Sequence, residues 1–514
     1  MKPGKHYQTL IVLASIKFLL PFILQSPVYE PHRDEFLYLA EGNHLAWGYM
    51  EVPPLLSVFA WLINLFGNGL FWIKFWPSLF GAFTFIVTGN IVLSLGGRSY
   101  ALLLSFLPFI FGVFLRIHFL FQPNFLEVFF WTMLAYSIIR YIQTEKVKWL
   151  YVFGISAGLG MLSKYSVAFF IISIVAGLLL TPQRKILFNK HFWFGALIGS
   201  IIFLPNAFWQ IQNHLPVVFH MKELQKYQLQ YVDTPGFLVD QILMNLPCVF
   251  LWIAGLWFAA FTKNGKPFRF TAWAYISLIV LLLVLHGKNY YSIGTYPLLF
   301  ALGSFHLEQF TLRRRKYLRY VFVAIIFIIG LPLVPAALPT ASPGRLANYY
   351  RRMKLSETDL VKWEDLQHHP LPQDFSDMLG WKEMAEKMAA AYNTLDSNEK
   401  KHTILFCDNY GQAGAVNLYR QKYHLPEAYS DNASFLYWLP DTGRLVNIVL
   451  LTDDHNEMQH AFIKDFSTAV LNDSITTPYA RERGDLIITL KGANEAFNQM
   501  FKEKIAKDKA QFNY

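Results

Sequence analysis

The chain has 514 residues, of which 54% are hydrophobic and 17% aromatic, and its formal net charge is +10. A soluble chain of this length would seldom be so apolar, so the composition favours a membrane protein. Residues 1–340 hold 25 Lys+Arg against 11 Asp+Glu, whereas residues 341–514 hold 20 against 24. The basic loops of membrane proteins explain this excess, and we expect no nucleic-acid partner. With two cysteines, Cys248 and Cys407, we expect neither a disulfide framework nor a cysteine metal site.

Apolar runs of spanning or nearly spanning length recur through residues 1–340 and predict about 11 membrane spans. No small-residue cleavage site follows the first run, so we interpret it as an uncleaved span. A shorter apolar segment, residues 54–67, is predicted to be an interfacial or re-entrant helix. The predicted spans cover residues 8–25, 70–95, 100–117, 124–142, 149–163, 165–181, 192–209, 236–261, 270–286, 290–307 and 319–338.

Lysine and arginine are distributed unevenly between the two sets of loops. With the N-terminus inside, the inside loops and the N-terminus hold 17 Lys/Arg, and the outside loops with nearby span ends hold seven. Cytoplasmic loops carry the basic excess in membrane proteins, so this asymmetry predicts the orientation. An odd number of spans then places the C-terminal part outside. We expect a multi-pass protein of the inner (cytoplasmic) membrane with an extracytoplasmic C-terminal domain.

Residues 341–514 follow a proline-rich stretch and differ in pattern from the membrane part. Past residue 400, β-like runs alternate with helical ones, whereas residues 345–400 are more helical. These runs predict strands at 403–407, 447–452 and 485–490, and helices at 411–423 and 493–508. The sequence therefore predicts an α-helical membrane domain over residues 1–340 and a small α/β domain over residues 341–514, called the tail below.

Acidic residues cluster in the first outside loop, residues 26–69, called the first loop below. Five of the 11 acidic residues in the membrane half lie there: Glu30, Asp34, Glu35, Glu41 and Glu51. Carboxylates beside hydrocarbon are costly, so the cluster needs a reason, such as a proton to remove, a cation to hold or a basic partner. A loop of solvated charges without a role is the alternative.

The segment from Asp34 to Trp47 reads as a helix. At 100° per residue, Asp34, Tyr38 and Glu41 share one face of that helix, and Glu35 points elsewhere. The glycine and the paired prolines that follow predict a fixed turn, which holds the last carboxylate of the first loop in place.

Four motifs resemble bacterial GT-C glycosyltransferases of families 39 and 83, which include protein O-mannosyltransferases and the aminoarabinose transferase of lipid A. The first motif is Asp34-Glu35 followed by Gly48-Tyr49-x-Glu51-x-Pro53-Pro54-Leu55. The others are the segments 158–165 (GLGMLSKY), 286–291 (HGKNYY) and 409–415 (NYGQAGA). Each motif is weak alone, but together they occur in the right order and cover most of the chain.

The resemblance implies an enzyme that moves a sugar from a polyprenyl-phosphate donor, of the undecaprenyl type, to an extracytoplasmic acceptor such as a lipid, polysaccharide or protein. It implies that Asp34 is the catalytic base, with Glu35 as the second catalytic candidate. The chemistry agrees, because an acceptor hydroxyl needs a carboxylate within hydrogen-bond reach as it attacks the anomeric carbon. Direct displacement of this kind inverts the anomeric centre.

The leaving lipid phosphate needs cations or hydrogen-bond donors. Lys288, flanked by two tyrosines, is the first choice, although a basic residue at a span end often only reaches the interface. Glu127 stands one turn after Asn124, where many relatives carry an aspartate. The candidates for binding donor phosphate or substrate are Arg33, Arg116, Lys164, Lys288, Tyr290, Tyr291, Glu41 and Glu127.

A divalent cation is a candidate cofactor. In the aminoarabinose transferase, the glutamate before the Pro-Pro pair joins a histidine of a later outside loop at a zinc ion. Glu51 matches that glutamate, and His220 or His214 could supply the imidazole, although two ligands are too few to establish a metal site.

A membrane lipid or sugar transporter, or a flippase, is the main alternative to a transferase. Transporters place polar groups near the bilayer midplane, often with repeat symmetry. In this chain the acidic residues crowd one face of the membrane and no repeat is apparent, which favours the transferase.

Overall fold

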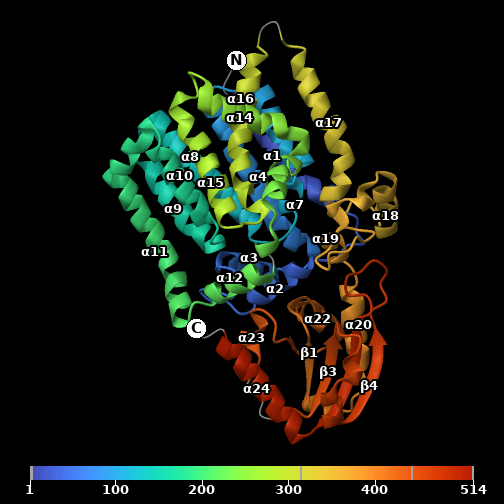
Figure 1. The fold of residues 1–514 in the computed structure, drawn as a ribbon. Coiled ribbons are helices and arrows are strands. Elements are labelled where there is room, and N and C mark those ends of the chain that lie inside the picture. Colours follow the sequence, from blue (N-terminus) through green and yellow to red (C-terminus); the bar gives the residue numbers. More distant parts are fainter. Residues whose placement is uncertain (1–3, 228, 313–314, 441–443, 512–514) are drawn as a thin grey trace.

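The computed structural model describes residues 4–227, 229–312, 315–440 and 444–511. A bundle of membrane helices and a domain built around a β-sheet lie end to end (Figure 1). The N-terminus lies at the end of the bundle that is remote from the sheet, and helices α2, α3 and α12 lie where the bundle meets the tail. The first loop therefore occupies the boundary between the two parts.

Six helices in the described part of the chain are long and apolar enough to cross a membrane. Two further spans arise if each of two bent pairs counts as one: α10 (Val167–Leu179) with Pro182–Phe188, bent by 118°, and α13 (Thr234–Leu243) with Leu246–Phe261, bent by 68°. The chain is thus a multi-pass membrane protein with six to eight candidate spans. The six are α1 (Gly4–Leu24), α4 (Leu70–Ser94), α8 (Asn124–Thr144), α11 (Lys190–Gln212), α15 (Arg269–Val284, preceded by Lys266–Phe268) and α17 (Leu318–Ala337).

The other three of the 11 predicted spans form shorter helices. A 16-residue helix is about 24 Å long, less than the roughly 30 Å of hydrocarbon that a span must cross. The ammonium of Lys17 donates to the carbonyl oxygens of Phe109 (2.8 Å) and Phe114 (3.2 Å), where one helix is broken. The short helices are α5 (Ser99–Phe106), α6 (Pro108–Phe111), α7 (Phe114–Ile117), α9 (Lys148–Ser163), α14 (Val249–Phe261, within the second bent pair) and α16 (Tyr296–Phe310).

The first loop folds into two helices, α2 (Arg33–Glu41) and α3 (Leu55–Leu65). The predicted short helix at 54–67 is confirmed, but the helix predicted to reach Trp47 ends at Glu41. The hydroxyl of Tyr49 donates to the Glu41 carbonyl oxygen at 3.0 Å and accepts from the Ala46 N–H at 3.1 Å, so the turn that follows satisfies the end of α2.

The tail contains a five-stranded sheet of order β2-β1-β3-β5-β4, in which β2, β1 and β3 are parallel and the other pairs antiparallel. The predicted α/β domain is therefore confirmed. Two strands were not predicted, because β2 has two residues and the edge strand β4 is largely exposed. The strands are β1 (Thr403–Cys407), β2 (Ala428–Tyr429), β3 (Asn447–Thr452), β4 (Phe466–Ser474) and β5 (Leu486–Ala493).

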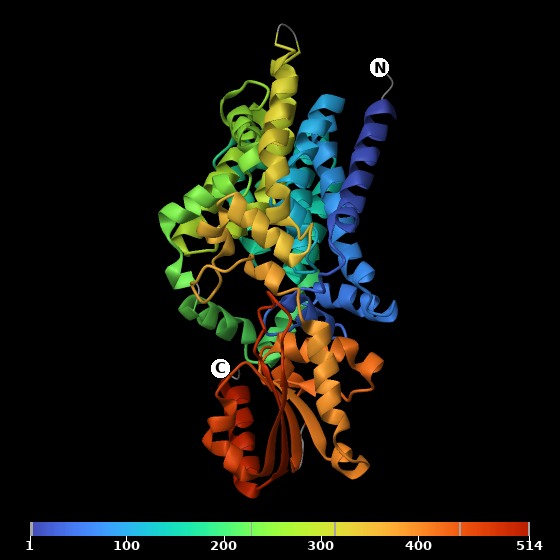
Figure 2. The ribbon, with the colours of Figure 1, turned by 90° about the vertical axis from the view of Figure 1, so that its right-hand side faces the viewer.

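Helices cover both faces of this sheet (Figure 2). Side chains alternate along a strand, so Leu405 and Cys407 pack with α20 (Trp381–Asn393) and α22 (Tyr410–Tyr423), whereas Phe406 packs with α24 (Glu495–Gln511). Short helices complete the described chain: α12 (Pro216–Tyr227), α18 (Pro343–Arg352), α19 (Gln373–Ser376), α21 (Ser397–Lys401) and α23 (Phe435–Trp438).

Helix α2 belongs to the tail's hydrophobic core as well as to the first loop. Phe36, Leu37 and Ala40 join the buried cluster that contains Trp381 and Val416. Helix α17 ends at residue 337 and α18 begins at residue 343. Leu338, in the connection, and Leu346, in α18, belong to one buried hydrophobic cluster. The tail and the first loop therefore form one packed unit.

Candidate active site

A cavity of about 800 Å³ lies between the membrane helices and the tail. Its walls include residues from helices α2, α8, α12 and α22. The turns before α3, after α9 and before α16 also line the cavity. It brings together seven residues singled out from the sequence: Asp34, Glu51, Lys164, His220, Lys288, Tyr290 and Tyr291. Residues from distant parts of the chain thus meet in one space.

Asp34 lies in the first turn of α2, and its carboxylate reaches the cavity. One oxygen, Oδ1, accepts a hydrogen bond from the Tyr410 hydroxyl at 2.8 Å, and Oδ2 accepts from the Gln122 amide at 3.0 Å. His32 caps the N-terminus of this helix, where its Nδ1 accepts a hydrogen bond from the Asp34 backbone N–H at 3.1 Å. A capped helix end and two side-chain donors therefore fix the position of this carboxylate.

Glu35 points away from the cavity, as the helical period predicted. Its side chain is fully buried and contacts the Lys74 ammonium at 2.6 and 2.7 Å. It also accepts from the backbone N–H groups of His32 (2.8 Å) and Phe121 (2.6 Å). The Glu35 carboxylate is thus already engaged by Lys74 and two backbone N–H groups and does not line the cavity, and its catalytic role stays a prediction.

Lys164 and its partners form a polar group at the start of α8. Its ammonium lies 2.6 Å from Asn124 Oδ1 and 2.9 Å from Glu127 Oε2. The ammonium also lies over the rings of Tyr290 (5.3 Å) and Tyr291 (5.1 Å). Glu127 is buried and does not line the cavity, so it acts on the site through Lys164.

Lys288 differs from Lys164 in having no ion-pair partner within 4.0 Å in the described part of the chain. Burial lowers the pKa of Lys288, the neighbouring Lys164 lowers it further, and Asp34 is among the carboxylates that oppose the shift. The Lys288 ammonium lies 5.9 Å from the centre of the Tyr290 ring. This arrangement leaves a cation whose charge an anionic ligand in the cavity would stabilise.

Glu51 and His220 both line the cavity, as the candidate metal site requires. Both oxygens of Glu51 are already engaged by Ser434, through its backbone N–H at 2.8 Å and its hydroxyl at 2.6 Å. Among the described residues, two groups of three possible ligand atoms lie within 4.8 Å of one another, and neither group includes Glu51 or His220. Glu41 is fully buried and does not line the cavity. Neither of its carboxylate oxygens has a hydrogen-bond partner in the described part of the chain.

Arg33 and Arg116 do not reach the cavity and instead contact the tail. The Arg33 Nε lies 3.5 Å from Glu482 Oε1, and the Arg116 guanidinium lies 2.7 Å from Asp374 Oδ2. Both arginines therefore already have carboxylate partners. Their binding of the donor phosphate stays a prediction.

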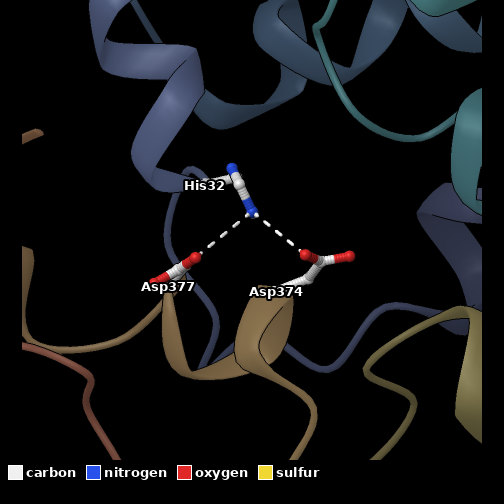
Figure 3. Close-up of side chains that lie close together, drawn as sticks. All are labelled: His32, Asp374 and Asp377. Atoms are coloured by element: carbon white, nitrogen blue, oxygen red, sulfur yellow. Dashed lines mark ion pairs between the residues drawn. The ribbon is translucent and has the colours of Figure 1, made fainter. Parts of the chain in front are cut away.

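A second set of ligand-type atoms lies outside the cavity, where His32 Nε2 faces Asp374 (3.7 Å) and Asp377 (3.8 Å), as Figure 3 shows. These three atoms lie close enough together that they could hold a metal ion. However, Nδ1 of the same ring accepts the Asp34 N–H, and a neutral imidazole then carries its proton on Nε2. In this tautomer Nε2 carries the proton, faces the carboxylates without a hydrogen bond to either, and is not a metal ligand.

Sequence reasoning assigned no role to Tyr410, Gln122 or Ser434. The segment that contains Tyr410 was singled out only for its resemblance to a family. Tyr410 and Asp34 are 376 positions apart, and Ser434 and Glu51 are 383 apart. Hydroxyl and amide side chains are common, so only the fold shows which of them meet a carboxylate.

Comparisons with known proteins found similar sequences and similar folds. Residues 51–209 match the family described as dolichyl-phosphate-mannose-protein mannosyltransferase. The lipid A galacturonosyltransferase RgtD of Rhizobium johnstonii is 25% identical over 204 residues, which span 37% of this chain and 41% of that protein. The match thus covers less than half of the relative's length.

Two solved structures of ArnT from Cupriavidus metallidurans share the fold. The structure bound to undecaprenyl phosphate has a TM-score of 0.62 and 14% identity, and the apo structure has 0.60 and 13%. Each alignment covers 95% of this chain and 98% of ArnT. The chain therefore has the ArnT-like fold of a multi-span membrane protein, and its residues 51–209 match the mannosyltransferase family.

Proposed function

We propose that this protein is a membrane glycosyltransferase that moves a sugar from a polyprenyl-phosphate donor, of the undecaprenyl type, to an extracytoplasmic acceptor. The observation that carries the proposal is the single cavity that holds Asp34 together with Lys288 and Lys164. Displacement at an anomeric carbon needs a base for the attacking hydroxyl and cations for the leaving phosphate. The cavity supplies both, and similar proteins include glycosyltransferases.

In the proposed reaction, Asp34 accepts the proton of the acceptor hydroxyl as that oxygen bonds to the anomeric carbon. The bond between this carbon and the phosphate oxygen breaks, and its electron pair leaves with the lipid phosphate. Lys288 and Lys164 stabilise the negative charge of that phosphate. A single displacement of this kind inverts the anomeric configuration.

The proposed domains are a catalytic membrane domain over residues 1–340 and the tail over residues 341–514. We place the N-terminus in the cytoplasm and the tail outside the cytoplasmic membrane. The excess of Lys/Arg in alternate loops supports this orientation, because basic loops stay in the cytoplasm. A reporter enzyme that is active only outside the cytoplasm, fused after residue 514, tests it: activity of the fusion is expected, and its absence alongside cytoplasmic reporter activity would reverse the orientation.

One relative is named as a lipid A galacturonosyltransferase, so a lipid is the acceptor to test first. Polysaccharide and protein acceptors are the other classes of extracytoplasmic glycan carrier. The cavity lies at the boundary between membrane helices and tail, which suits an acceptor held at a membrane surface.

Mass spectrometry of envelope lipids and glycans tests the function directly. Cells without the gene are compared with cells complemented by the wild type, by Asp34→Asn or by Asp473→Asn. Asp473 is an exposed residue of β4 and serves as a matched control for the substitution. We expect the wild type and Asp473→Asn to restore a mass difference of one sugar unit.

Asp34→Asn is expected to restore none of that difference while reaching wild-type protein levels in the membrane. Full restoration by Asp34→Asn would show that Asp34 is not the base. Substrate counterflow through liposomes without any covalent transfer would favour a transporter instead.

A further inference from the structure

The tail contacts three consecutive residues at the start of α2. His32 faces Asp377, and Arg33 lies beside Glu482. Asp34, next in the chain, accepts the hydrogen bond from the Tyr410 hydroxyl. The segment that carries the proposed base is thus held by a part of the chain more than 300 positions away.

The fit between α22 and α2 depends on two glycines. A Cβ atom on Gly414 would lie 2.6 Å from Phe36 Cβ and 3.0 Å from the Phe36 backbone, and one on Gly411 would lie 2.6 Å from Arg33 Cγ. Larger residues at either position would push the helices apart. The segment 409–415, NYGQAGA, is therefore explained as a surface for close packing against α2.

The same segment fixes the direction of Tyr410. Asn409 caps α22 by accepting from the Gln412 backbone N–H at 3.1 Å, and Tyr410 is the first residue of the helix. The Arg33 guanidinium lies 5.1 Å from the centre of the Tyr410 ring. With its backbone capped and its ring stacked, the Tyr410 hydroxyl has little freedom to leave Asp34.

Asp34 is held from two sides by two different parts of the chain. Tyr410 donates to Oδ1 from the tail, and Gln122 donates to Oδ2 from the residues just before α8. Each carboxylate oxygen has two lone pairs, so both oxygens can still accept the proton of a substrate hydroxyl. The two donors fix the plane of the carboxylate without blocking it.

We propose that Tyr410 is a positioning residue of the transfer reaction, which holds the Asp34 carboxylate oriented in the cavity. The inference rests on the proposed function and extends it to the tail. It makes the tail part of the reaction centre, in addition to any role in choosing the acceptor.

Loss of the Tyr410 hydroxyl has a distinctive consequence. The Asp34 carboxylate keeps the Gln122 donor on Oδ2 but loses its donor on Oδ1, so its orientation toward the attacking hydroxyl is no longer fixed. The rate of transfer then falls, while binding of the lipid phosphate does not change. The charged and titratable groups that act electrostatically on or with Asp34 stay in place in such a variant: His32, Arg33, Tyr38, Lys288 and Tyr290.

The test compares Tyr410→Phe with Tyr419→Phe in the full-length purified protein. Both tyrosines lie on α22, and the Tyr419 hydroxyl also crosses to the first loop, where it donates to Glu30 at 3.3 Å. The two variants lose the same atom from the same helix, but only one loses a contact with the proposed base. Transfer is measured with the donor and acceptor identified by mass spectrometry, and binding is measured with undecaprenyl phosphate as the probe.

For Tyr410→Phe we expect kcat to fall roughly 10-fold, as for loss of a hydrogen bond to a charged group, with unchanged affinity for undecaprenyl phosphate. Tyr419→Phe is expected to match the wild type in kcat and in affinity for undecaprenyl phosphate.

An unchanged kcat in Tyr410→Phe would overturn the proposal, as would equal losses in both variants, which would indicate tail docking alone. Asp34→Asn separates these results from the wider proposal. If Asp34→Asn is inactive while Tyr410→Phe is normal, only the positioning role fails. If Asp34→Asn stays active, the proposed base itself is wrong.

Discussion

The membrane helices and the tail supply different chemistry to the same cavity. The membrane part contributes the ammonium groups of Lys164 and Lys288, which suit an anionic lipid phosphate. The tail contributes the hydroxyl of Tyr410, which lines the cavity, and the buried hydroxyl of Ser434, and each donates to a carboxylate of the first loop. The first loop thus lies between a region that supplies ammonium groups and a region that supplies hydroxyl donors to carboxylates.

This difference separates two properties that substitutions can test independently. Changes on the membrane side should alter donor binding, and changes on the tail side should alter the rate of transfer once the donor is bound. The predictions below follow that division.

The largest effect is expected at Lys288. Lys288→Ala should weaken binding of undecaprenyl phosphate roughly 10- to 100-fold, because a hydrogen bond to a charged group is worth about 1.5–3 kcal/mol. Binding titrations with the purified protein measure this. Equal affinity in the wild type and in Lys288→Ala would remove Lys288 from the proposed phosphate site.

Lys288 also predicts a pH dependence. Since burial and Lys164 lower its pKa, its positive charge is lost at a lower pH than that of an ordinary lysine, and affinity for undecaprenyl phosphate should fall as pH rises. Lys288→Arg keeps its charge through that range, so its affinity should stay flat. Parallel pH curves for the two proteins would show that another group causes the decline.

The packing of α22 on α2 gives the next effect. Gly414→Ala should cost about 1–3 kcal/mol, because the added methyl group overlaps Phe36, and it should slow transfer by displacing Tyr410. Thermal unfolding and transfer assays report the two consequences. Gly344→Ala is the matched control, since its methyl group would meet only the Tyr479 hydroxyl, at 3.7 Å. Similar behaviour of both variants would contradict the close packing.

Ser434→Ala should have a smaller effect. It removes the hydroxyl that donates to Glu51, but the Ser434 backbone N–H still donates to the other oxygen. A net hydrogen bond is worth about 1 kcal/mol, so a roughly fivefold lower transfer rate with unchanged undecaprenyl phosphate binding is expected. A change in undecaprenyl phosphate binding without a change in transfer rate would contradict this prediction and would assign Ser434 to donor binding.

The smallest effect on transfer is expected from Glu41→Gln. Burial and the nearby Glu51 raise the pKa of Glu41, so the folded state binds a proton that the unfolded state releases. Stability should therefore fall as pH rises above the ordinary glutamate range, and Glu41→Gln should remove this slope without slowing transfer. Unfolding midpoints measured across pH check the sign. A steeper slope in Glu41→Gln would show that Glu41 is ionised.

Much of the arrangement could be predicted from the sequence, because it depended on local pattern. The helical period correctly separated Asp34 from Glu35, and apolar run length identified the membrane part. Short helices were counted as spans because composition does not reveal where a helix breaks. The ion pair of Arg116 could not be predicted, because its partner, Asp374, lies far along the chain.

The role of Tyr410 could not be predicted for a related reason. A hydroxyl gains its role from what it contacts, and that contact joins two regions separated by most of the chain. Charged residues near apolar runs are recognisable because burying charge is costly, whereas a tyrosine in the tail carries no such signal.

The most direct test of this account measures undecaprenyl phosphate binding and sugar transfer on the same purified Asp34→Asn protein. The account predicts that this variant binds undecaprenyl phosphate with wild-type affinity, because Lys164 and Lys288 are intact, and transfers no sugar. Normal binding together with normal transfer would contradict the central claim that Asp34 is the base.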